Sequence, residues 1–66
     1  MKNKPQQIYV YDIETDSWHL AVEIDFRYEK IVVMQSPKYG FTRNKLSKVI
    51  LALELPEGKT LAQDGE

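Results

Sequence analysis

Residues 18–28 alternate strictly between apolar and mostly charged side chains. Every even position is apolar, and the odd positions are His19, Ala21, Glu23, Asp25 and Arg27. Successive side chains of a β-strand point to opposite faces, so this spacing predicts a strand with one apolar face and one largely charged face. We therefore expect Val22 and Ile24 to be buried, and Glu23 and Asp25 to be exposed.

Two further stretches extend the predicted sheet. Residues 7–13 form a first strand, in which Ile8 and Val10 are assigned to the core and Tyr9 and Tyr11 to the opposite face. Residues 31–36 begin Ile-Val-Val, and such β-branched residues favour a buried strand. Polar or turn-forming residues separate the first two strands and follow the third. Residues 7–36 are thus predicted to form a three-stranded antiparallel β-meander.

A helix over residues 42–54 is the expected cover for this sheet. Leu46, Val49, Ile50 and Leu53 have the spacing of one helical face, and Pro56 supplies a stop. The predicted fold class is therefore α+β, a three-stranded antiparallel β-meander covered by one C-terminal α-helix. Apolar residues also alternate at the start of residues 48–63. The alternative is an all-β fold in which 48–63 form a further hairpin.

The composition indicates one small domain. It comprises 66 residues, with residues 1–6 as a flexible lead-in and 59–66 as a polar tail. Because a short chain buries little surface and this one has no cysteine, association with a partner or with itself is the expected source of added stability. The lack of cysteine also favours the cytoplasm, and the apolar runs are too short to span a membrane.

The candidate catalytic chemistry is sparse. His19 is the only imidazole, and it lies roughly 13 Å from Glu23 along an extended strand. Glu23 and Asp25 share a face, but a chain of this length offers little around them to build a pocket. The sequence predicts a protein that is not an enzyme, with no metal, no cofactor and no small-molecule substrate.

The charges are segregated along the chain. Residues 12–29 contain six acidic side chains and one basic side chain, whereas residues 30–48 contain five basic side chains and none that is acidic. The net charge of −1 therefore conceals two oppositely charged stretches. Each stretch suggests its own binding function.

Protein binding through the acidic stretch is the first function predicted. Aromatic side chains beside charged ones suit an interface with a few anchors and a polar rim. The expected role is a regulator or inhibitor of the kind carried by phages and mobile elements, with a protein partner or a second copy in a homodimer. The residues assigned to this interface are Tyr9, Tyr11, Glu23, Asp25 and Arg27.

Binding of single-stranded nucleic acid is the alternative function. Basic side chains interleaved with aromatic ones in residues 38–48 can neutralise phosphates and stack on bases. The acidic pI of about 5.8 counts against it. The residues assigned to this alternative are Lys38, Tyr39, Arg43, Lys45 and Lys48.

Overall fold

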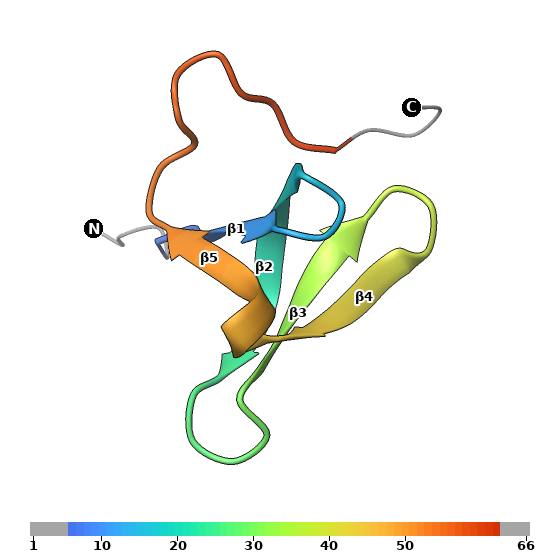
Figure 1. The fold of residues 1–66 in the computed structure, drawn as a ribbon, viewed down its shortest axis with the longest axis vertical. Coiled ribbons are helices and arrows are strands. Elements are labelled where there is room, and N and C mark those ends of the chain that lie inside the picture. The colour runs from blue at the N-terminus through green and yellow to red at the C-terminus, as the bar shows by residue number, and fades with distance from the viewer. Residues whose placement is uncertain (1–5, 63–66) are drawn as a thin grey trace, which may run out of the picture.

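The computed structural model describes residues 6–62, which form a single curled β-sheet (Figure 1). The strands are β1 (Tyr9–Asp12), β2 (Ser17–Asp25), β3 (Ile31–Ser36), β4 (Gly40–Lys45) and β5 (Val49–Ala52). One turn of 3-10 helix, η1 (Leu46–Lys48), joins β4 to β5. The strand order is β4-β3-β2-β1-β5, and all neighbours are antiparallel.

The predicted α-helix is absent from the described residues, so the α+β prediction is wrong and the all-β alternative fits. Residues 42–45 belong to β4, because a tight turn ending at Gly40, whose φ is 84°, returns the chain alongside β3. Only residues 46–48 are helical, and they form a single 3-10 turn. The stretch taken for a helix therefore contains parts of two strands.

Burial shows why the strand pattern prevails in β5. Ile50 and Leu53, on the presumed apolar face of the helix, are exposed, whereas Leu51 packs against the core. Pairing of β5 with β1 also satisfies backbone groups that a helix would have had to satisfy internally. The all-β alternative also expected the later residues of 48–63 to pair with the strand before them in a hairpin. Instead, Leu61 forms an isolated bridge with Trp18 of β2.

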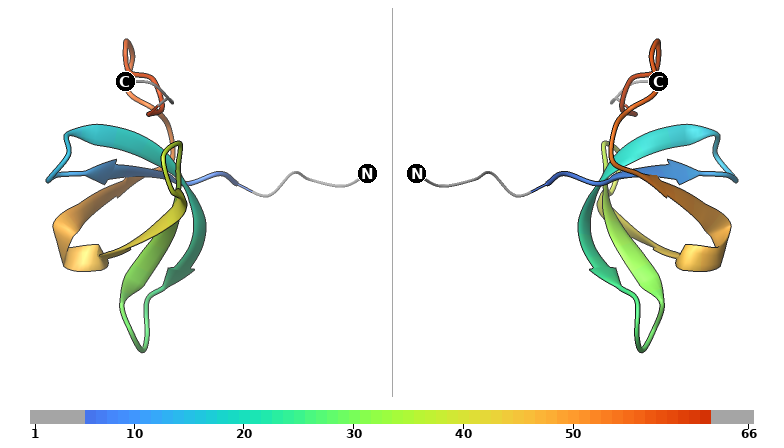
Figure 2. Two further views of the ribbon diagram at one scale, coloured as in Figure 1. Left: turned by 90° about the vertical axis from the view of Figure 1, so that its right-hand side faces the viewer. Right: turned by 90° about the vertical axis from the view of Figure 1, so that its left-hand side faces the viewer.

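The sheet curls because β2 belongs to both of its halves. Residues 17–20 of β2 pair with β1, whereas residues 21–25 pair with β3. Figure 2 shows β2 bending strongly between the two halves. The buried core lies on the concave side and consists of Val10, Val32, Met34 and Val49.

A β-bulge in the middle of β2 exchanges the two faces of that strand. The pairing with β3 shifts between Ala21 and Glu23, so that one extra residue, Val22, is accommodated. Before the bulge, His19 and Ala21 face the concave side; after it, Ile24 does. Trp18, Leu20 and Val22 consequently lie on the outer face.

This arrangement overturns half of the burial prediction for β2. Val22 is 52% exposed, although the strict alternation assigned it to the core. Ile24 packs against the core as expected, and Glu23 is exposed. In β1, Val10 is fully buried, as predicted, while Tyr9 and Tyr11 face outward and are half-buried.

Two buried polar side chains, Asp12 and His19, form hydrogen bonds between strands of the curled sheet. Asp12 accepts hydrogen bonds from the backbone N–H of Glu14 (3.0 Å) and from Asn44 Nδ2 (3.1 Å), which links β1 to β4. His19 Nδ1 donates to the carbonyl oxygen of Gln35 (2.8 Å), which links β2 to the end of β3. Because a carbonyl only accepts, the neutral imidazole must accept at Nε2 from the Ser17 hydroxyl (2.8 Å).

The chain after β5 returns to the edge of β2. The backbone N–H of Ala62 donates to the carbonyl oxygen of Trp18 (2.8 Å), next to the Trp18–Leu61 bridge. This short contact occupies β2 where β3 has diverged from it. The expected polar tail 59–66 is described only as far as residue 62. Of the expected lead-in 1–6, all but Gln6 lies outside the described residues.

The turn between β2 and β3 carries a backbone strain that can be tested. Lys30 has a φ of 55°, a left-handed conformation in which a Cβ is unfavourable. Replacing Lys30 with glycine should stabilise the fold by about 0.5–1 kcal/mol. This value is the free energy of the relieved strain minus the entropic cost of the greater freedom that glycine gives the unfolded chain. The gain would raise the melting temperature by about 2–8 °C. Lys30→Ala is the control, since it keeps the Cβ, and equal melting temperatures for the two variants would contradict this account.

Candidate protein-binding face

The outer face of β2, β3 and β4 carries an uncovered group of apolar side chains, which we name the outer patch: Val22, Val33 and Phe41. The bulge turns Val22 outward, and Val33 and Phe41 lie at outward positions of β3 and β4. Phe41 is 60% exposed and Val22 is 52% exposed. Together with Thr42 and Arg43, the outer patch lines a shallow hollow of about 480 Å³. An aromatic side chain this exposed on a sheet face is a candidate interface anchor.

Charges of both signs border the outer patch. Val33 lies opposite Glu23 on one side and Arg43 on the other, and the next outward row runs from Asp25 through β3 to Lys45. Glu23, Asp25 and Arg43 line one small hollow of about 80 Å³. Acidic and basic rows two strands apart are separated by about 10 Å. Two residues assigned to the protein interface, Glu23 and Asp25, therefore share one face with two assigned to the nucleic-acid alternative, Arg43 and Lys45.

Asp25 is already engaged by its own turn. Its carboxylate accepts hydrogen bonds from the backbone N–H groups of Arg27 (2.9 Å), Tyr28 (3.0 Å) and Glu29 (3.1 Å). These bonds, led by the one from Tyr28, lower the pKa of Asp25 below its ordinary value. Asp25 thus stays charged while it holds the β2–β3 turn, and this turn also carries the exposed Arg27.

Tyr9 and Tyr11 lie on the other half of the curled sheet. They are paired with Leu20 and Trp18 of β2, and the ring centroids of Tyr11 and Trp18 are 5.3 Å apart. The Tyr11 hydroxyl donates a hydrogen bond to the carboxylate of Asp16, which raises the pKa of Tyr11. The structure therefore separates the two tyrosines from Glu23 and Asp25, with which they were grouped.

The residues of the nucleic-acid alternative are dispersed over three places. Arg43 and Lys45 lie on the outer face of β4. Lys38 and Tyr39 lie in the β3–β4 turn, where Lys38 Nζ is 5.5 Å from the Tyr39 ring centroid. Lys48, at the end of η1, makes an exposed ion pair with Glu14 at 3.6 Å. They do not form one continuous basic surface.

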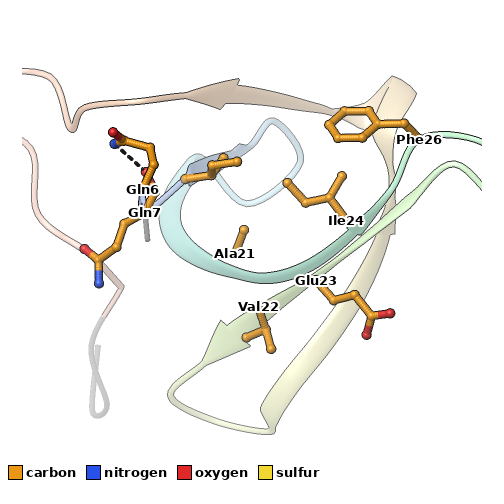
Figure 3. Close-up of a pocket in the computed structure, with 8 residues that line it drawn as sticks. Gln6, Gln7, Ala21, Val22, Glu23, Ile24 and Phe26 are labelled. Carbon is orange, nitrogen blue, oxygen red and sulfur yellow. Dashed lines mark hydrogen bonds between the residues drawn. The ribbon is translucent and has the colours of Figure 1, made fainter. Parts of the chain in front are cut away.

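A second hollow, of about 880 Å³, opens at the end of the core between residues 6–8 and β2 (Figure 3). Ala21, Ile24 and Phe26 project to one side of β2, and Val22 and Glu23 project to the other. At the rim, Gln6 Nε2 donates to the carbonyl oxygens of Gln7 (3.1 Å) and Leu53 (3.3 Å). Its lining consists of apolar side chains, the amides of Gln6 and Gln7, and one carboxylate, that of Glu23.

Residues 6–62 contain no cluster of three or more His, Cys, Asp or Glu side chains that could hold a metal ion. Both ring nitrogens of His19 are hydrogen-bonded within the fold. No helix in the described part of the chain is long and apolar enough to cross a membrane.

Sequence reasoning missed the apolar members of this site. The strict alternation of residues 18–28 assigned Val22 to the core. The bulge that turns Val22 outward contains no glycine or proline, so the sequence does not signal it. Phe41 directly precedes the predicted helix over residues 42–54 and received no role, although it alternates with Arg43 and Lys45 on what proves to be a strand. Recognising that alternation is the signal by which Phe41 could have been placed on the outer face.

Comparisons with protein-family models, curated proteins and solved structures find no match to this chain.

Proposed function

We propose that this chain is a non-enzymatic protein-binding domain that uses the outer patch as its contact surface. The observation that carries this proposal is that the apolar side chains of β2 point outward as far as the bulge. Val22 lies among them and meets Val33 and Phe41 on an uncovered sheet face. Exposing such side chains to water has a free-energy cost that a partner surface would remove.

The borders of the outer patch define the partner's chemistry. Glu23 lies on one side of Val33 and Arg43 on the other. The complementary surface has an apolar centre, with a basic group facing Glu23 and an acidic group facing Arg43. Charges arranged in this way favour one orientation of the partner and accelerate the encounter.

The same arrangement gives less support to nucleic-acid binding. A phosphate backbone lying along Arg43 and Lys45 would pass about 10 Å from the row of Glu23 and Asp25. At that distance, slightly beyond the Debye length of about 8 Å at physiological salt, the repulsion by the carboxylates is largely screened, so it opposes nucleic-acid binding mainly at low salt.

The biological role that we propose is that of a regulator or inhibitor, acting by occupying a surface of its partner. Glu23 and Asp25 contribute the negative charge that was first assigned to the interface, now beside the outer patch. The cytoplasm is the proposed location, because the sequence contains no cysteine and suits a reducing compartment.

The test is affinity capture with the immobilised chain, followed by affinity measurements with the purified partner. Val22→Asp and Phe41→Asp should each weaken binding at least tenfold, because a desolvated carboxylate would replace an anchor. Tyr39→Asp is the matched control, since it changes an exposed aromatic residue in the β3–β4 turn.

Equal binding by the wild type and by Phe41→Asp would overturn the proposal. So would binding to a labelled single-stranded oligonucleotide that weakens steeply with salt, which would favour the alternative function. Far-UV circular dichroism of each variant establishes that the fold is retained.

A further inference from the structure

The two edge strands of the sheet differ in their protection against pairing with another strand. β4 and β5 lie at opposite ends of the strand order. β4 carries Arg43 and Lys45, and charged side chains of this kind discourage edge-to-edge association. β5 has the sequence Val-Ile-Leu-Ala, without a charge, proline or bulge. It is the edge without such protection.

The backbone of β5 directs hydrogen-bonding groups outward at its centre. In an antiparallel ladder, consecutive residues direct their N–H and C=O groups to opposite sides. The Ile8 carbonyl accepts from the N–H of Ala21, so Ile8 faces β2 and Tyr9 faces β5. Ala52, the partner of Tyr9, faces back to β1. Its neighbour Leu51 therefore directs its backbone groups to the free edge.

We propose that two copies of this chain associate by antiparallel pairing of their β5 edges, with a two-fold axis at Leu51. Leu51 then faces Leu51 of the second copy, and the two residues exchange a pair of backbone hydrogen bonds. Ile50 faces Ala52 of the second copy on the outer face, and each side chain covers part of the other. The interface is isologous, so every contact occurs twice.

The residues flanking β5 have complementary charges in this register. Lys48 is the last residue of η1, directly before the strand, and Glu54 lies in the bend that follows it; an antiparallel pair centred on Leu51 brings the end of β5 that carries Lys48 next to the end that carries Glu54 in the second copy. Two attractive pairs therefore border an uncharged centre. Lys48 is 57% exposed and its ion pair with Glu14 is solvated, so redirecting its side chain costs little. Ile50, 53% exposed, gains the cover that the single chain does not give it.

Charge reversal tests this register directly. Sedimentation equilibrium at low salt should show concentration-dependent dimerisation of the wild type. Lys48→Glu and Glu54→Lys should each weaken dimerisation about tenfold, since two attractive pairs become two repulsive ones. The double variant Lys48→Glu/Glu54→Lys should recover the wild-type dissociation constant to within about threefold. High salt should reduce these differences.

Lys59→Glu is the matched control, because it reverses an exposed lysine away from β5 and should leave dimerisation unchanged. A wild type that stays monomeric at millimolar concentration would overturn the proposal. So would single reversals without effect, or a double variant that remains weak. Retention of an extended segment of another protein at β5 by a monomeric wild type would also overturn it.

Discussion

Met34→Ala is expected to lower the free energy of unfolding by about 2–5 kcal/mol. Met34 is 1% exposed and lies between Ala21 of β2 and Thr42 of β4, at the centre of the curled sheet. Removing its side chain loses apolar burial and leaves a cavity that neighbouring strands cannot fill without losing their register. A chain of this size has a total stability of about 3–10 kcal/mol, so much of it depends on this residue. Urea denaturation monitored by circular dichroism measures the loss.

Val22→Ala is the control for this prediction. Val22 occupies the position that strict alternation assigned to the core, yet it is 52% exposed. Its truncation should change the free energy of unfolding by no more than about 0.5 kcal/mol. Equal losses for the two variants would show that the bulge does not direct Val22 outward.

Asn44→Asp should destabilise the fold by about 2–4 kcal/mol at neutral pH. The Asn44 amide donates to the buried Asp12 carboxylate, which joins β4 to β1 across the core. A carboxylate in its place removes the donor and puts two negative charges about 3 Å apart. Such a pair retains one shared proton up to a higher pH than a single carboxyl does, so the penalty shrinks as the pH falls and grows as the pH rises. Urea denaturation at about pH 5 and about pH 7.5 measures this dependence.

Asn44→Ala separates the two causes of that loss. It removes the hydrogen bond without adding a charge, so its cost should be smaller, about 1–2 kcal/mol, and similar at both pH values. An Asn44→Asp protein that is equally stable at both pH values would indicate that the two side chains do not face each other.

The strands could be predicted from sequence where one period dominated. β3 begins and ends at the predicted residues, because Ile31-Val32-Val33 fits only an extended, largely buried segment. Residues 48–54 satisfied a helical and a strand period together, and the local pattern could not decide between them. The strand conformation is favoured because β5 pairs with the second edge of β1, a segment about 40 residues earlier in the sequence. Single-sequence reasoning does not see such a partner.

The charged residues of the candidate site could be predicted from the sequence, but the apolar outer patch between them could not. Glu23 and Arg43 were both singled out, yet only the pairing of each with Val33 shows that they border one surface. The inserted residue of the bulge shifts the strand by one position, which reverses the faces for all residues beyond it. The sequence carries no mark of this shift.

The pairing of β1 with both β2 and β5 sets the order in which the sheet can be completed during synthesis. Tyr9 meets Leu20 soon after both residues emerge, whereas its other neighbour, Ala52, is translated 43 positions after it. Until then, the β1–β2 hairpin exposes an unpaired edge and the apolar side chains that later face Val49 and Leu51. Closing so long a loop is slow compared with forming a hairpin. The nascent chain therefore cannot complete its apolar core until β5 has been translated.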